Sequence, residues 1–416
     1  MAPRDRPLLS AVQAAQRLGV KPETLYAYVS RGFVTSVRGA DGRRSAFDPA
    51  EIDRLAARPR RAAGRPAGLS IHTRLAGASE DGLSYRGRSA TELARHSSFE
   101  AVTSLLWTGE LESTAMLAAP ELASAARALV HALPSGATAI DRLGAGLGGL
   151  AAADPLKGDL RPEAVVATGR TLLAGLVAAL PERRALPEQP GHTEQPGHTE
   201  AVPGTGLAAR LWPKLSHNPA SSGAAALLDA ALVLLADGEF TAATLAARIA
   251  ASARAHPYAV AAAGLAALAA PGQTPPSAAV HRALADAEGE GLAPVLARLL
   301  GAGALPGFGH PLFPGGDPRA RTLLELLGAA PPDPFRWQHV TGFLAASSRG
   351  TPVPPSTGFA LGALSYTAGM PAGAGELIFA LARIAGWIGH ALEEYAEDPG
   401  RLRATATYTG ENSGQP

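Results

Sequence analysis

Apolar residues in the first 57 positions recur at helical spacing in three short runs, which predicts a small unit with its own core. Ser10 can cap the first helix, and Pro22 suits the first turn of the second, which Gly32 ends after Arg31. The apolar residues expected to face inward in these two helices are Ala11, Ala14, Ala15, Leu18, Leu25 and Val29.

The segment from Phe33 to Phe47 changes to an alternating pattern around Ala40-Asp41-Gly42, which predicts a β-hairpin. Asp48, followed by Pro49, can then cap a third helix that turns Ile52 and Leu55 inward. Residues 1–57 are therefore expected to form one domain, built from a helix-turn-helix and a wing.

From residue 69 onward the pattern is that of an Ala-rich helical body. Helical periodicity predicts helices over 224–236, 241–254, 258–270 and 376–395, and the Pro-rich stretch 271–276 ends the third. Leu245, Ile249 and Ala253 fall on one stripe of the second of these helices. The fold class expected for the whole chain is mainly α.

Two segments fall outside these patterns. Residues 58–68, RPRRAAGRPAG, are a basic linker, and either a DNA minor-groove arm or a solvated tether accounts for them. Residues 181–204 contain EQPGHT twice in tandem, at 188–193 and 194–199. A duplication in a tolerant, disordered surface loop explains this repeat better than weak metal binding by its two histidines, so no metal site is expected.

Composition narrows the function classes. The formal net charge of +1 gives no overall attraction to nucleic acid or membranes, so any such affinity has to be local. The absence of cysteine excludes disulfides and thiol nucleophiles. No signal-peptide core and no uncharged apolar run of about 18 residues occurs, so a cytoplasmic protein without membrane partners is expected.

The segment that concentrates chemistry is Leu305-Pro-Gly-Phe-Gly-His310, with Arg319 nine residues after the histidine in Asp317-Pro-Arg319. Gly307 and Gly309 allow a tight turn, His310 can act on a developing alkoxide, and Arg319 can bind a carboxylate through its planar fork. A turn that merely carries a histidine is the alternative for the first motif taken alone.

These motifs resemble those of the citrate synthase family, whose hallmark is a GFGH or GYGH loop followed by DPR. Two further stretches share the resemblance, DGLSYRG at 81–87 and FALARIAGWIGH at 379–390, followed by Glu393, Arg403 and Tyr408. The resemblance spans residues 69 to 410. It implies an all-helical body over 69–416 that forms a two-fold homodimer, with a large subdomain of about 69–272 and 369–416 and a small subdomain of about 273–368.

The family reaction is a condensation of an acyl-CoA with a 2-oxo acid, by general acid–base catalysis and oxyanion stabilisation. The resemblance implies that Arg319, Arg383 and Arg403 bind the carboxylates, with Arg403 reaching across the dimer, and that His310 acts on the oxo carbonyl. Acetyl-CoA is then a co-substrate, and no bound cofactor is expected. His390, on the same apolar helix as Arg383, is interpreted as a packed core residue.

Other positions depart from the family pattern. Leu235 and Gly238 replace two histidines, and Gln273 replaces the first catalytic histidine; its amide can donate a hydrogen bond but cannot exchange protons near neutral pH. Pro354 stands where the general base belongs, and no Asp or Glu occurs between Asp333 and Glu376. Pro311 and Pro314 replace basic positions that help to hold CoA phosphates in the family.

The N-terminal domain resembles the excisionase and MerR-type DNA-binding domains. The resemblance implies contacts with double-stranded DNA from helix and wing residues, namely Lys21, Thr24, Tyr26, Ala27, Arg31, Arg38, Arg43 and Arg44. A protein-interaction module is the alternative. One such unit binds weakly, and a dimer would pair two of them.

Two hypotheses follow. In the first, the body binds a di- or tricarboxylate with lost or reduced condensation activity, and the N-terminal domain makes the protein a metabolite-responsive regulator. In the second, the chain is an active citrate or 2-methylcitrate synthase with an altered set of catalytic residues. A version of this hypothesis is a heterodimer in which a paralogous citrate synthase supplies competent sites. The missing carboxylate favours the first hypothesis, and family membership favours the second.

Overall fold

The computed structural model describes residues 8–18, 20, 25, 29, 34–38, 45–56, 71–79, 82–183, 206–219, 222–238, 240–303, 305–350 and 353–403. The chain divides into two compact units, Met1–Ile71 and His72–Pro416. The predicted disordered loop lies outside the described residues from position 184 onward.

The N-terminal unit contains a small antiparallel sheet and two described helices. Its strands have the order β1-β3-β2, and Phe47 pairs with both Leu9 and Ser36. The elements are β1 (Leu9–Ser10), α1 (Ala11–Leu18), β2 (Ser36–Arg38), β3 (Ser45–Phe47) and α3 (Pro49–Ala56). The predicted hairpin and third helix are thereby confirmed.

Local chemistry explains how these elements begin and pack. Ser10 Oγ accepts a hydrogen bond from the Gln13 amide at 3.3 Å, while Gln13 Oε1 accepts from the Ser10 amide at 2.9 Å, which caps α1. The core of the unit consists of Ala14, Ala15, Leu18, Leu25, Val34, Phe47 and Ile52.

The predicted DNA-contacting residues are not described in full. Lys21, Thr24, Tyr26, Ala27, Arg31, Arg43 and Arg44 lie outside the described residues. The backbone of Arg38 is part of β2, but its side chain is outside the description. The helix-turn-helix and its DNA contacts therefore stay predictions.

The second unit is a helical body with one small antiparallel sheet of order β4-β5-β6. Its strands are β4 (Ala76–Ser79), β5 (Gly82–Tyr85) and β6 (Arg88–Ser89). Its helices are α4 (Ala90–His96), α5 (Phe99–Thr108), α6 (Pro120–His131), α7 (Ala139–Ala153), α8 (Pro162–Ala179), α9 (Leu207–Leu215), α10 (Ser222–Leu235), α11 (Ala242–Ser252), α12 (Pro257–Leu268), α13 (Ser277–Glu290), α14 (Leu292–Gly301), α15 (Pro318–Ala329), α16 (Pro334–Gly350), α17 (Thr357–Thr367) and α18 (Ala374–Tyr395).

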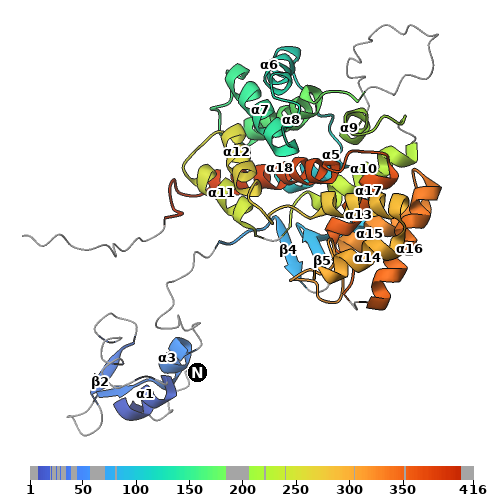
Figure 1. Ribbon diagram of the computed structural model, residues 1–416. Coiled ribbons are helices and arrows are strands. Elements are labelled where there is room, and N and C mark those ends of the chain that lie inside the picture. The colour runs from blue at the N-terminus through green and yellow to red at the C-terminus, as the bar shows by residue number, and fades with distance from the viewer. Residues whose placement is uncertain are drawn as a thin grey trace, which may run out of the picture. The chain divides into compact units, whose positions relative to one another are not determined.

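The longest helix of the body, α18, forms its centre. Figure 1 shows it passing between the α6–α8 layer and the helices around α17, and it packs against α5, α7, α8, α10, α11, α12, α13 and α17. Among the helices of the described part, α18 alone has the length and apolarity to span a membrane. Because 89% of its apolar stretch is buried inside the body, it is a core helix here.

The predicted helices that become α10, α11, α12 and α18 are confirmed to within a few residues. The predicted stripe on α11 does not mark its buried face, since Ile249 is 46% exposed. The buried face carries Thr244, Arg248 and Ala251 instead. Polar partners on α18, described below, are the reason that an arginine can point inward.

Candidate functional site

The GFGH loop is held against the segment that precedes α17. The Gly309 amide donates to Pro354 O at 2.8 Å, and the Ser356 amide donates to Gly307 O at 2.8 Å. Gly307 has φ +80°, and a Cβ there would lie 2.8 Å from the Phe359 nitrogen, so this position requires glycine. Pro354 is therefore built into the wall beside the loop.

His310 and Arg319 meet at the end of this loop. The Leu312 amide donates to His310 Nδ1 at 3.2 Å, and Arg319 Nη2 lies 3.3 Å from His310 Nε2. The ring of Phe313 packs on both, with its centroid 5.0 Å from the imidazole centroid and 5.4 Å from Arg319 Cζ. The sequence motif therefore does bring its histidine and its arginine together.

Asp317 holds Arg319 in place. Arg319 is 3% exposed, and its Nε and Nη2 each donate to one Asp317 carboxylate oxygen at 3.0 Å. The Asp317 carboxylate also accepts from the Thr357 hydroxyl and from the Arg319 amide at the start of α15. Burial raises the pKa of Asp317, but Arg319 and these hydrogen bonds outweigh it and hold that pKa below its usual range.

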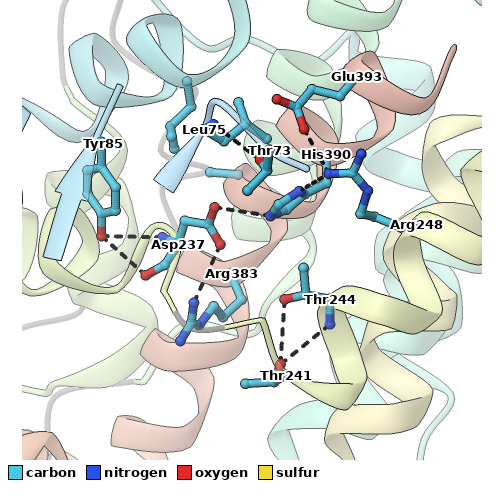
Figure 2. Close-up of polar contacts among 12 residues, drawn as sticks. Thr73, Leu75, Tyr85, Asp237, Thr241, Thr244, Arg248, Arg383, His390 and Glu393 are labelled. Carbon is cyan, nitrogen blue, oxygen red and sulfur yellow. Dashed lines mark hydrogen bonds and ion pairs between the residues drawn. The ribbon is translucent and has the colours of Figure 1, made fainter. Parts of the chain in front are cut away.

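Arg383 lies on α18 beside a second buried carboxylate. Its Nη1 is 3.6 Å from Asp237 Oδ1, and its guanidinium lies over the Phe379 ring at 5.0 Å (Figure 2). Asp237 follows α10 and is fully buried. Burial raises the pKa of Asp237, but contact with His390 and Arg383 outweighs burial and lowers it.

Tyr85 shows that Arg319 and Arg383 belong to one region. This buried phenol of β5 accepts from the Asp237 amide at 3.3 Å and contacts Val233 O at 3.0 Å. Burial raises the pKa of Tyr85, while the Asp237 backbone and the charges of Arg383 and Arg319 lower it in part. The charges of both guanidinium groups therefore act on the same hydroxyl.

Gly238 explains one departure from the family pattern. A Cβ at this position would lie 2.5 Å from Arg383 Nη2 and 2.9 Å from its Cζ. The guanidinium of Arg383 thus fills the space that a histidine side chain at position 238 would enter.

His390 is buried, as predicted for a core residue, but both of its ring nitrogens have polar partners. Its Nε2 lies 3.2 Å from Asp237 Oδ2, and its Nδ1 lies 2.9 Å from Arg248 Nη1 (Figure 2). Arg248 is 1% exposed and also contacts Glu393 and Glu394. Sequence reasoning missed this cluster, although two acids three and four residues after His390 on an apolar helix were a signal that cations lie nearby.

Gln273 and Arg403 lie apart from these groups. Gln273 is exposed on the turn after α12, where its backbone N–H donates to Ala270 O at 3.1 Å. Arg403 is exposed near the end of the described chain, and its Nε donates to Gly400 O at 2.9 Å. None of the contacts in the described part joins either residue to His310, Arg319 or Arg383, so their expected roles stay predictions.

The described residues contain no group of three or more histidine, aspartate or glutamate side chains that could hold a metal ion. The site is thus built from arginines, two buried aspartates and two histidines. Such a set suits the binding of carboxylates and of oxygen atoms that gain negative charge.

Several known proteins are similar to this chain in sequence and in fold. The family model "Citrate synthase, C-terminal domain" matches residues 62–404. The chain is 28% identical to 2-methylcitrate synthase 2 of Corynebacterium glutamicum over 347 residues, which cover 79% of this chain and 89% of that protein. It is also 28% identical to citrate synthase 2 of Bacillus subtilis over 364 residues, which cover 80% and 91% of the two chains.

Solved structures agree on the fold. Citrate synthase from Pyrobaculum aerophilum has a TM-score of 0.67 and 22% identity, over 84% of this chain and 92% of that one. The ternary complex of carboxymethyl coenzyme A and oxaloacetate with citrate synthase from Thermoplasma acidophilum has a TM-score of 0.64 and 20% identity, over 84% and 96%. Since the family model spans most of the sequence, the chain belongs to the citrate synthase family.

Proposed function

We propose that the body is a citrate or 2-methylcitrate synthase-type transferase, which joins an acyl-CoA to a 2-oxo dicarboxylate such as oxaloacetate. The observation that carries the proposal is the pair of His310 and Arg319, whose facing nitrogens lie 3.3 Å apart on adjoining turns. The similarity to citrate and 2-methylcitrate synthases over most of the body supports it.

The hydrogen bonding of His310 favours an oxygen ligand. A guanidinium only donates, so the contact of Arg319 with Nε2 and that of the Leu312 amide with Nδ1 both need an acceptor, whereas a neutral ring has only one. A ligand oxygen would resolve this conflict: with the Leu312 bond kept, the proton lies on Nε2, and Nε2 and Arg319 become two converging donors. One oxygen of an oxo acid, either carbonyl or carboxylate, would accept from both.

The proposed condensation makes use of these donors. A base removes a proton from the acyl methyl group, the resulting enol carbon attacks the oxo carbon, and the carbonyl oxygen takes up a proton as it becomes a hydroxyl. Water then cleaves the thioester, which releases CoA and a tricarboxylate. His310 would stabilise the carbonyl oxygen, and Arg319 and Arg383 would bind the carboxylates.

A second candidate function is supported by Pro354. This residue offers no base, its carbonyl is engaged by the Gly309 amide, and no acid occurs in residues 334–375. Loss of a positioned base typically lowers a rate by about a hundred- to ten-thousandfold. The second candidate is therefore a carboxylate-binding dimer with little or no turnover. It would bind DNA through its N-terminal unit and regulate transcription in response to the carboxylate.

One assay compares the two candidates on the purified full chain. CoA release from acetyl-CoA and from propionyl-CoA is measured with oxaloacetate, and thermal stabilisation by oxaloacetate and by citrate is recorded on the same sample. Arg319→Gln is the site variant. Arg321→Gln, an exposed arginine two residues further along α15, is its matched control.

Turnover in the ordinary enzyme range that R319Q abolishes and R321Q keeps would support the transferase and exclude the second candidate. A melting shift with citrate but no CoA release would support the carboxylate-binding protein, and DNA binding by the full chain with and without citrate would then be measured. If neither signal appears, the carboxylate site itself is wrong.

A further inference from the structure

A single buried arginine, Arg248, stands between two of the arginines that are expected to bind carboxylates. Its Nη1 donates to Glu393 Oε2 at 2.7 Å, and its Nε donates to Glu394 Oε1 at 2.6 Å. The same Nη1 lies 2.9 Å from His390 Nδ1. Glu393, in turn, accepts from the Arg74 amide at 2.7 Å. One guanidinium therefore contacts three side chains of α18.

The contact with Arg248 fixes which nitrogen of His390 carries the proton. Because a guanidinium has no acceptor, Nδ1 of His390 has to be the acceptor of this hydrogen bond. The ring proton then lies on Nε2, which is 3.2 Å from Asp237 Oδ2. Arg248 thus orients a histidine whose Nε2 faces a buried carboxylate.

Asp237 connects His390 to Arg383, so the orientation of the histidine affects that of the arginine. Its Oδ2 contacts His390, while its Oδ1 faces Arg383 Nη1 at 3.6 Å. Figure 2 shows the four side chains as a series of contacts, from Arg248 through His390 and Asp237 to Arg383. A rotation of the Asp237 carboxylate would therefore move the guanidinium that packs on Phe379.

A second branch leads from Arg248 to the segment that carries Arg403. Glu394, which Arg248 contacts, also accepts from Arg401 Nη2 at 2.6 Å and from Arg401 Nε at 3.1 Å. Ser252 lies one turn after Arg248 on α11. It accepts from the Gly400 amide at 2.7 Å through its carbonyl and from the Leu402 amide at 3.4 Å through its hydroxyl.

We propose that Arg248 is a positioning residue for the carboxylate site, acting on Arg383 through His390 and Asp237 and on Arg403 through Glu394 and Arg401. The inference rests on the proposed function in one respect, that Arg383 and Arg403 bind the ligand's carboxylates. Arg248 itself touches no substrate.

Two substitutions of His390 test one step of the first branch, the contact of its Nε2 with Asp237. Asn places its amide oxygen near the position of Nδ1 and keeps the acceptor for Arg248, whereas Gln places its amide nitrogen near Nε2 and keeps a donor for Asp237. Because only Gln keeps the group that faces Asp237, the Kd for citrate is expected to rise at least tenfold in His390→Asn and less than threefold in His390→Gln. A merely structural histidine would give the two variants equal affinities at similar melting temperatures.

A double-substitution cycle tests the second branch. Arg403→Gln is expected to weaken citrate binding about tenfold in the wild-type chain but less than twofold in an Arg401→Gln chain, because Arg403 is then no longer held. Arg298→Gln, in an exposed ion pair of α14, is the matched background and should leave the tenfold effect intact. Equal effects of R403Q in both backgrounds would overturn this branch.

A measurement without ligand separates the failure of this proposal from a failure of the proposed function. In the histidine side-chain nitrogen NMR spectrum of the full chain, the signal that is absent in H390Q is expected to show the proton on Nε2. In Arg248→Lys, which keeps the charge but not the planar fork, this single tautomer should be lost. A proton on Nδ1 in the wild-type chain, or an unchanged tautomer in R248K, would overturn the role of Arg248 even if no carboxylate binds.

Discussion

Two buried arginines of this molecule, Arg319 and Arg248, solve the same physical problem in different ways. Arg319 takes its carboxylate from Asp317, two residues earlier on the same turn. Arg248 takes its partners from α18, 142 to 146 residues later in the sequence. Each guanidinium is almost completely removed from water, so each needs acceptors supplied by the protein. The first arrangement is local, and the second exists only after the body has folded.

This difference predicts which property of the protein each arginine affects, the shape of one loop or the stability of the whole body. A charge pair within one turn forms whenever that turn forms, so Asp317 and Arg319 can shape the loop on their own. The Arg248 cluster instead joins α11 to α18 and to the segment after it, so its loss should affect the stability of the whole body. Removing one partner of a buried ion pair typically costs about 3–5 kcal/mol, because the other charge stays buried.

The largest expected effect is that of Glu394→Gln. Glu394 is 1% exposed and contacts both Arg248 and Arg401, so the amide would leave two guanidinium groups without their shared charge. The free energy of unfolding of the body should fall by about 3–5 kcal/mol in urea titrations at pH 7.5. Glu325→Gln, in the exposed pair with Arg95, is the control and should change it by less than about 1 kcal/mol. A loss below 1 kcal/mol in E394Q would show that the long-range cluster adds no more than a surface pair.

The local pair should give a smaller loss with a distinct pH dependence. In Asp317→Asn the amide oxygen can still accept from the start of α15, and the Thr357 hydroxyl can turn to accept from the amide nitrogen, so a loss of about 2–3 kcal/mol is expected near neutral pH. The folded pKa of Asp317 lies below its unfolded value, so its contribution is present above the unfolded pKa and is lost as the pH falls through the folded value. The difference between wild type and D317N in urea unfolding should therefore shrink below about pH 4. A difference that stays constant would contradict the ion pair.

The same contrast explains what could be predicted from sequence. The Gly-Phe-Gly-His and Asp-Pro-Arg motifs are short, and their geometry follows from glycine φ values and a helix start, so the closeness of His310 and Arg319 could be expected from sequence. On α11, apolar periodicity drew attention to Leu245 and Ile249, whereas the buried face includes Arg248. No local pattern reveals a buried arginine, because the acids and the histidine that stabilise it lie on another helix. The residues of the N-terminal unit that were expected to contact DNA remain predictions for a different reason, since most of them lie outside the described residues and their partner is a second molecule.

Position 354 offers a way to introduce a general base beside the loop that carries His310. In Pro354→Asp the carbonyl can still accept from the Gly309 amide, and position 354, which precedes Pro355, favours the extended backbone that this contact uses. If the carboxylate site binds oxo acids as proposed, the new carboxylate should raise kcat for CoA release at least tenfold. Pro354→Asn keeps the size and removes the base, so it should stay at the wild-type rate. An equal rate in both variants would mean that position 354 does not face the acyl group.

The smallest expected effect concerns a half-buried carboxylate with no arginine partner among its described contacts, in contrast to Glu394. Asp229 on α10 accepts from the Phe99 amide at 3.2 Å and 3.3 Å and lies near Glu100. Burial raises the pKa of Asp229 to about 7, and the charge of Glu100 adds to this, with only the Phe99 hydrogen bond opposing it. Asp229 is thus the converse of Asp237, whose pKa His390 and Arg383 lower despite complete burial.

The sign of the pH effect follows from this raised value. A folded pKa above the unfolded one favours the folded state at low pH, and this contribution is lost as the pH rises from about 4 through about 7. Asp229→Asn removes the titration while its amide oxygen can still accept from Phe99. It should therefore stabilise the body by about 1 kcal/mol at pH 8 and change it little at pH 5, as measured by urea unfolding at both values. Asp286→Asn, in the exposed pair with Arg298, should show no such pH-dependent gain. If D229N destabilised the chain equally at both pH values, Asp229 would be a permanently charged cap of α5. A half-buried carboxylate in this fold would then stay charged without the cation partners that the buried Glu394 and Asp237 have.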